Sequence, residues 1–112
     1  MKTNLTNKEM CDWLVANGYP LTCHPGEILK DNLEDMNLSA YKVAKDLKLN
    51  RGTISGVLNG SKKITVQTGV LLARYFDNSL AFWVNMQNGF ELDFIEKSMT
   101  AELEQVPHAV AQ

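Results

Sequence analysis

Apolar residues recur along this chain with the three-to-four-residue period of an α-helix, and no stretch alternates in the manner of a half-buried β-strand. The segment TNKE, from Thr6 to Glu9, has the spacing of a capping box and predicts a helix that ends before Pro20. A second helix is predicted over residues 25–36, where Pro25 suits the first helical position. Each segment gathers its apolar residues on one face, so both are expected to pack against a core.

Capping residues mark the helices that follow. Ser39 is predicted to cap a helix whose apolar members run to Leu47, and a connection of three or four residues joins it steeply to another helix, to which Leu49 and residues 53–58 belong. Thr65 is predicted to cap the next helix and Ser79 the one after it, and residues 91–106 continue the helical pattern. Tyr41 is expected on the apolar face of the helix that Ser39 caps. The inward side chains expected after Thr65 are Val66, Val70, Leu71, Ala73 and Phe76.

These elements predict an all-α fold: a helix-turn-helix bundle of about five helices with an extra N-terminal helix and a C-terminal helical extension. We place the bundle at residues 21–92, the N-terminal extension at residues 1–20 and the C-terminal helix and tail at residues 93–112. A length of 112 residues, 45% of them hydrophobic and 21% charged, suits one globular domain with short extensions. No apolar run approaches the roughly 18 residues of a membrane span, and no secretory signal is present. We therefore expect a cytoplasmic protein.

Catalytic and metal-binding patterns are absent from the sequence. There is no H-E-x-x-H, no G-x-S-x-G and no glycine-rich phosphate loop, so neither an enzyme nor a cofactor is expected. Cys11 and Cys23 have the number for one bridge, but without an export signal they are expected to be reduced thiols. Together with His24 they lack paired C-x-x-C spacing, so no metal site is expected.

Charge is distributed unevenly along the chain, although the net charge is only −2. Residues 39–76 hold seven basic side chains against Asp46 alone, whereas residues 1–38 and 77–112 are each acidic on balance. A lysine-rich surface can simply be solvated, or it can neutralise the phosphates of a nucleic acid. The positions of the lysines distinguish a solvated surface from one that binds phosphate.

Residues 40–59 fit the helix-turn-helix template. Ala44 is the small residue that lets the second helix approach the first, and Ile54 and Val57 anchor the second helix from beneath. Any helical hairpin with a tight turn would share these apolar matches, but the basic residues lie where a docked helix would bring them near the DNA backbone. The residues expected to contact phosphate are Ser39, Lys42, Lys45, Asn59, Lys62 and Lys63.

Residues 24–92 resemble the HigA-type antitoxins of bacterial toxin–antitoxin modules, within the lambda-repressor-like helix-turn-helix superfamily. The motifs that carry the resemblance are HPGEIL, TIS…LNG, the IT pair Ile64 and Thr65, LARYF and FWVNMQNGFEL. The resemblance implies a small homodimer that binds a palindromic operator, represses its own operon and neutralises a partner mRNA-cleaving toxin. The implied partners are thus double-stranded operator DNA, a second copy of the chain and a small basic toxin, with no membrane.

The sequence also departs from the family pattern. Lys48 stands at the turn position usually held by glycine, where a left-handed backbone would be strained, and Ala40 replaces the usual glutamine that contacts phosphate. Gly52 and Gly56 lie where base-contacting side chains are expected, and each lowers helix propensity by about 1 kcal/mol. Either the two glycines allow the helix backbone to approach DNA closely, or they indicate that this helix recognises bases weakly.

Base contacts then fall, by elimination, to the first turn of the second helix. The candidates are Asn50, Arg51, Thr53 and Ser55. Arg51 is the best candidate for a bidentate contact to guanine, and Thr53 for a thymine methyl or a phosphate. Asn50 suits a helix cap, a phosphate contact or both. Much of the specificity is then expected to come from DNA shape.

A monomer with so few base contacts is expected to bind DNA as a dimer across two half-sites. The expected dimer interface is the aromatic-rich set Phe82, Trp83, Met86, Phe90 and Phe94, part of which the monomer core also needs. Acidic surfaces complement a basic toxin. The choice stays open between the N-terminal helix with Trp13 and the tail with Glu96, Glu102 and Glu104.

Two other functions remain open on the sequence alone. A stand-alone transcriptional regulator would keep the DNA binding and lack the toxin. A helical protein-interaction module with weak DNA binding would account for the departures at Ala40, Lys48, Gly52 and Gly56.

Overall fold

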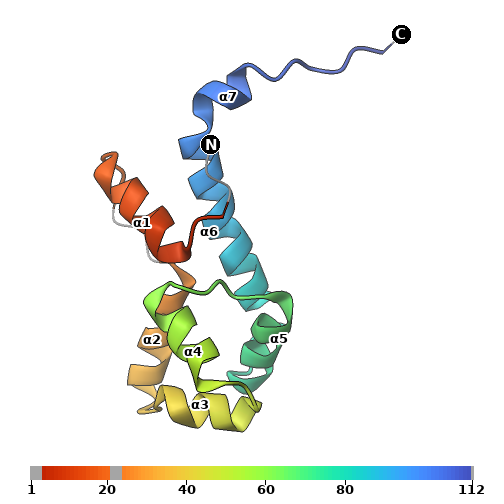
Figure 1. Cartoon of the computed structure of the whole chain (residues 1–112). Coiled ribbons are helices and arrows are strands. Elements are labelled where there is room, and N and C mark those ends of the chain that lie inside the picture. Colours follow the sequence, from red (N-terminus) through yellow and green to blue (C-terminus); the bar gives the residue numbers. More distant parts are fainter. Residues whose placement is uncertain (1–3, 21–23, 112) are drawn as a thin grey trace.

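The structure is a computed structural model that describes residues 4–20 and 24–111, and all regular structure in these ranges is helical (Figure 1). The helices, in chain order, are α1 (Asn7–Ala16), α2 (Pro25–Asp35), α3 (Ala40–Leu47), α4 (Arg51–Asn59), α5 (Val66–Tyr75), α6 (Phe82–Ser98) and α7 (Thr100–Glu104). The all-α prediction is confirmed. Helices α2 to α6 form the bundle, with α1 as the N-terminal and α7 as the C-terminal extension.

One hydrophobic core holds the bundle together. Its fully buried members come from every helix of the bundle: Leu29, Val43, Ile54, Leu72 and Trp83. The indole Nε1 of Trp83 donates to the Oδ1 of Asn78 at 2.9 Å, so the one polar atom of this core aromatic is satisfied. A buried aromatic of this size is worth several kcal/mol to the fold, because truncating one to alanine typically costs about 3–5 kcal/mol.

A second, smaller cluster joins α1 to α6. Met10 and Leu14 of α1 pack against Phe90 and Phe94 of α6. Beyond this contact α6 projects away from the bundle and carries α7 at its end (Figure 1), which makes the molecule elongated at 54 × 36 × 21 Å. Because α6 runs unbroken from Phe82 to Ser98, the expected boundary between residues 92 and 93 lies inside a helix.

Side-chain caps begin most of the long helices, as predicted. The hydroxyl of Thr6 accepts from the backbone N–H of Glu9 at 3.1 Å, and the Glu9 carboxylate accepts from the Thr6 N–H at 2.9 Å, which completes the capping box. The hydroxyls of Ser39 and Thr65 cap α3 and α5 by accepting from the N–H of Lys42 and of Thr68, without the reciprocal bond of a capping box. The prediction for Ser79 is wrong: α6 begins two residues after the expected start, behind Ala81, and no side chain caps it.

Two apolar residues expected to point inward are exposed. Val66 is 68% and Tyr41 58% exposed. The buried face of α5 includes Gly69 and Leu72, because Gly69 lies against α6. A Cβ at Gly69 would be 2.7 Å from Cγ2 of Val84, so only glycine permits this approach of the two helices. That close contact sets the rotation of α5 and leaves its first residue in solvent. No helix in the described part of the chain is long and apolar enough to cross a membrane.

Candidate nucleic-acid interface

Helices α3 and α4 form the predicted helix-turn-helix. Ala44 is buried where the two helices meet, and Ile54 and Val57 are buried beneath α4. The turn depends on Lys48, whose φ of 57° is left-handed, as its position in the motif predicted. This conformation directs the N–H of Leu49 back to the carbonyl of Ala44 at 2.8 Å, which ends α3 and starts the steep turn into α4.

Helix α4 presents its first turn to solvent. Arg51 is the first residue of the helix, and together with Ser55, one turn later, it lies on the exposed face. None of the residues that the structure describes forms an ion pair with Arg51, so its guanidinium is available to a ligand. Two of the four predicted base-contacting residues thus share one accessible face.

Asn50 and Gly52 form a local unit at the start of α4. The Oδ1 of Asn50 accepts from the N–H of Gly52 at 2.7 Å, so Asn50 is the helix cap that the sequence allowed. A Cβ at Gly52 would lie 3.1 Å from that same oxygen, which is tighter than ordinary contact. Gly52 therefore makes room for the cap, and the side-chain amide of Asn50 keeps its two N–H donors for another partner.

Gly56 has a different role from the one its position suggested. It is buried, because the side chain of Lys62 folds back over it from the loop that follows α4. A Cβ at Gly56 would lie 2.7 Å from Cγ of Lys62, and the Lys62 N–H donates to the Gly56 carbonyl at 3.0 Å. The missing side chain lets the loop close on α4 and is not a missing base contact.

Thr53 lies apart from the other base-contacting candidates. It is half-buried and projects from α4 on the side away from Arg51 and Ser55, toward the loop after the helix. Its hydroxyl therefore belongs with the groups of that loop, and of its two predicted contacts the phosphate fits this position better than the thymine methyl.

The predicted phosphate contacts fall into distinct groups. Lys45 and Lys62 are exposed, and neither forms an ion pair among the described residues. Lys42 pairs with Asp46 at 3.0 Å on the surface, where an exposed pair contributes little and can exchange for a phosphate. Lys63 differs from Lys45 and Lys62, because its ammonium pairs with Glu91 on α6. Its charge is directed toward the bundle.

Hydrogen bonds within the fold engage the two polar candidates. The hydroxyl of Ser39 accepts from the N–H of Lys42 at 3.0 Å, but its own proton is left for a phosphate oxygen. The Oδ1 of Asn59 accepts from the N–H of Ser61 at 2.9 Å and shapes the turn that ends α4. Asn59 thus positions the loop and keeps only its amide N–H groups for DNA.

Asp46 is the single acid in the basic segment, and the structure holds it in the charged form. The phenol of Tyr75 donates to its carboxylate at 2.6 Å, and this bond, with that from Lys42, lowers the pKa of Asp46. The same contact raises the pKa of Tyr75. The acid is thus tied to α5 and to Lys42, which limits its repulsion of an approaching phosphate.

A buried amide pair, which the sequence did not single out, fixes the loop behind this surface. Gln87 of α6 and Asn7 of α1 exchange two hydrogen bonds, Asn7 Nδ2 to Gln87 Oε1 at 2.9 Å and Gln87 Nε2 to Asn7 Oδ1 at 2.8 Å. The Gln87 Oε1 also accepts from the N–H of Ile64 at 3.1 Å. The sequence contains one indication that Gln87 is buried, because this residue lies one turn after Trp83 and one turn before Phe90, on the inward face of α6.

His24 joins α2 to the same region. Its Nδ1 accepts from the N–H of Gly26 at 3.0 Å and caps α2. Burial lowers the pKa of His24, Lys8 lowers it further, and Glu27 opposes both. A neutral imidazole is required, because a protonated ring has no lone pair left to accept the cap bond.

Comparison with known proteins agrees with this geometry. The profile of the family described as Helix-turn-helix (HTH_3) matches residues 29–83. Virulence-associated protein I of Dichelobacter nodosus is 37% identical over 75 residues, which are 66% of this chain and 69% of that protein. The chain belongs to the HTH_3 helix-turn-helix family. Proteins of this family are DNA-binding proteins and not enzymes.

Solved structures place HigA antitoxins among the structural neighbours. The Pseudomonas aeruginosa antitoxin HigA, solved with the higBA promoter, has a TM-score of 0.72 and 29% identity, over 80% of this chain and 98% of that one. Another Pseudomonas aeruginosa structure, of a protein in complex with 18 base pairs of its operator DNA, has a TM-score of 0.73 and 30% identity, over 80% of this chain and 96% of that one. The chain therefore has the fold of HigA-like DNA-binding proteins.

The dimer interface expected for such a protein needs correction. Trp83, Phe90 and Phe94 are at most 7% exposed, because the first belongs to the bundle core and the other two are covered by α1. Met86 is half-buried against the bundle core, and only Phe82, at 40% exposed, offers a large free surface. The sequence could not show that α1 would occupy this face of α6.

The two candidate toxin-binding surfaces also differ in availability. Trp13 packs edge-on against Phe94 with ring centroids 5.5 Å apart and stacks on Tyr19 at 6.1 Å, so it mainly attaches α1 to α6. In the C-terminal region Glu96, Glu102 and Glu104 are all exposed.

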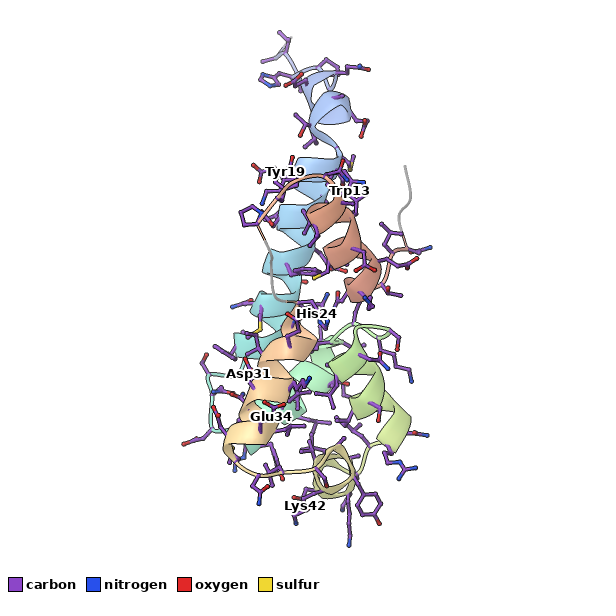
Figure 2. The ribbon with its side chains drawn as sticks, turned by 90° about the vertical axis from the view of Figure 1, so that its left-hand side faces the viewer. Trp13, Tyr19, His24, Asp31, Glu34 and Lys42 are labelled. Carbon is purple, nitrogen blue, oxygen red and sulfur yellow. The ribbon has the colours of Figure 1, made fainter. Side chains whose placement is uncertain are left out.

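Charge also differs between the faces of the bundle. Figure 2 faces the side of α2, where the labelled Asp31 and Glu34 point outward, while the start of α4 projects at the right edge of the view. Among the described residues no group of three or more His, Cys, Asp or Glu side chains could hold a metal ion, and Cys23 lies outside these residues.

Proposed function

We propose that this protein is an antitoxin and transcriptional autorepressor, which binds a palindromic operator as a homodimer and neutralises an mRNA-cleaving toxin encoded beside it. The observation that carries the proposal is the first turn of α4, where Arg51 is exposed; among the described residues Arg51, Lys45 and Lys62 of this basic segment form no ion pair. The likeness to HigA structures solved with promoter DNA supports it.

Base recognition in this proposal rests on few side chains. Arg51 makes a bidentate contact to the O6 and N7 of a guanine, worth about 1–3 kcal/mol of discrimination against another base. Ser55 and the amide N–H groups of Asn50 add weaker contacts from the same end of the helix. Gly52 leaves the backbone of the first turn uncovered, so the helix approaches the base edges closely and DNA shape supplies further specificity.

Of the predicted aromatic set, only Phe82 stays available for the homodimer, so the interface needs further residues. Apolar side chains remain exposed at both ends of one long helix: Leu80 and Phe82 near the start of α6, and Leu92 and Ile95 in its outer half. Isolated exposed apolar residues are common, but each of these two pairs places large apolar side chains close together in the chain, where a partner can cover them. The single variants Phe82→Glu and Ile95→Glu are each measured by analytical ultracentrifugation. The variant that loses the dimer identifies which end of α6 forms the interface.

The toxin contact is proposed for the exposed acidic C-terminal region. A toxin that binds RNA carries positive charge, and Glu96, Glu102 and Glu104 offer the complementary surface away from α4 (Figure 1). Reversing these three charges to lysine is expected to weaken the toxin complex and leave DNA binding unchanged.

A reporter assay tests the proposal as a whole. The DNA upstream of the gene is fused to a reporter, and wild-type protein is expected to repress it while Arg51→Ala does not. The neighbouring reading frame is then expressed with and without the protein. Growth arrest that only co-expression relieves establishes the antitoxin. Repression without a toxic neighbour would instead establish a stand-alone regulator, and equal reporter activity with both proteins would contradict DNA recognition through α4.

A further inference from the structure

A pocket of about 570 Å³ lies beside the first turn of α4. Four segments line it: residues 4–6 ahead of α1, Thr53 of α4, the loop residues 61–63, and Thr65 and Thr68 at the start of α5. Both figures place the segment ahead of α1 on the side from which α4 projects, at the front in Figure 1 and at the right in Figure 2. The segment ahead of α1 therefore lies on the side of the molecule from which α4 projects, and the pocket meets α4 at Thr53, on the face of the helix away from Arg51.

The lining of the pocket suits an anion. Thr53 contributes a hydroxyl group, and Lys62 contributes a charge without an ion pair among the described residues. The hydroxyls of Ser61 and Thr65 also line the pocket, but they donate to the carbonyl of Gly56 at 3.5 Å and to the hydroxyl of Thr68 at 3.2 Å and must exchange these bonds for an anion. No described carboxylate belongs to the lining. Hydroxyl groups and a lysine around a site without acidic groups are the donors that proteins use for phosphate oxygens.

The fold fixes the outer wall of the pocket in place. The Lys8 N–H donates to the carbonyl of Gly60 at 3.1 Å, and a Cβ at Gly60 would lie only 3.0 Å from the Lys8 backbone nitrogen. The buried amide pair of Asn7 and Gln87 holds the start of α1 against α6. Residues 4–6 are thus attached at one end to the loop that carries Lys62, and they do not lie there by packing alone.

The geometry points to residues 4–6 as part of the DNA-binding surface. A phosphodiester of the DNA strand beside α4 occupies the pocket, between Asn4 on the outer wall and Lys62 on the loop. This inference rests on the proposed DNA binding and extends it to a segment ahead of the helix-turn-helix. The match to the Pseudomonas HigA structure covers 98% of that chain but only 80% of this one, so part of this chain has no counterpart there.

A pair of opposite charges at Asn4 tests the inference. Asn4 is exposed and precedes the Thr6 cap, so Asn4→Lys and Asn4→Glu are expected to leave the melting temperature unchanged. Each is titrated as full-length protein against the duplex upstream of its gene. The side chains of Asn4→Lys and Asn4→Glu differ by two charges. At about 6 Å from one phosphate in water, this difference corresponds to about tenfold in DNA affinity, and Asn4→Lys should bind more tightly. Gln105→Lys and Gln105→Glu, beside α7 at the far end of the molecule, change the net charge equally and are expected to differ by less than about twofold.

The outcomes separate this inference from the proposed function. If Arg51→Ala weakens binding and the two Asn4 variants bind alike, the pocket is not a DNA contact, although the protein still binds DNA through α4. If neither Arg51 nor salt affects binding, the proposed function itself fails. Inorganic phosphate is also titrated into the protein alone and followed by the amide NMR signals of Thr53 and Thr65. Saturable shifts together with equal DNA affinity of the Asn4 variants would assign the pocket to a free anion and overturn the inference.

Discussion

Replacing Gln87 with leucine removes the hydrogen bonds that hold α1 and the loop after α4 to α6. The side chain is 3% exposed and makes three hydrogen bonds, two with Asn7 and one with the N–H of Ile64. Leucine preserves the bulk but leaves the Asn7 amide and the Ile64 N–H buried without partners, each at a cost of about 1–3 kcal/mol. Partial rehydration of α1 reduces the total, so we expect the free energy of unfolding to fall by about 3 kcal/mol.

Urea denaturation at one fixed protein concentration measures this loss, since a dimer's stability depends on concentration. The melting temperature should fall by about 12 °C, at about 4 °C per kcal/mol for a chain of this length. Asn88→Leu, at the exposed neighbouring position, is the matched control and should stay within about 0.5 kcal/mol of wild type. The double variant Asn7→Leu with Gln87→Leu removes both amides and should recover about 1 kcal/mol or more. A loss below about 1 kcal/mol for Gln87→Leu, or fully additive effects in the double variant, would refute the reasoning.

Three further variants test other parts of the structure. Gly56→Ala should displace Lys62 and reduce the salt dependence of DNA binding by about one phosphate contact. The melting temperature should change little, because alanine regains about 1 kcal/mol of helix propensity. An unchanged salt slope would contradict the role given to Gly56. Lys48→Gly should raise the free energy of unfolding in urea by about 0.5–1 kcal/mol, because glycine adopts the left-handed φ of 57° without strain; a loss of stability would contradict it. His24 has a lowered pKa, so its contribution is complete above its ordinary pKa of 6.5 and is lost as the pH falls below that value. Melting temperatures between pH 7.5 and 5 should therefore fall more for wild type than for His24→Asn, and parallel curves would exclude His24 as the cause.

Local chemistry made much of the fold predictable. Thr6, Ser39 and Thr65 cap helices where the sequence placed them, because a cap depends only on residues within one turn. The left-handed turn at Lys48 was predictable for the same reason. The helix-turn-helix core followed from periodicity, and Ile54 is fully buried as expected.

Contacts between distant segments were not predictable in this way. Phe90 and Phe94 carry the same apolar signal whether they meet α1 or a second protomer, and only the tertiary structure shows that α1 covers them. The pairing of Asn7 with Gln87 joins residues 80 positions apart, and no local pattern specifies it. At Gly56 the sequence showed an absent side chain, but the cause lies in Lys62, which folds back from the following loop.

The central claim is that α4 recognises DNA through its first turn. The most direct test is a fluorescence anisotropy titration of the duplex upstream of the gene at two salt concentrations, with wild-type protein, Arg51→Ala and a scrambled duplex. Wild type should prefer the upstream duplex and lose affinity steeply as salt rises, and Arg51→Ala should bind that duplex about tenfold or more weakly and show less preference for it. Equal affinity of wild type and Arg51→Ala for both duplexes would contradict the account.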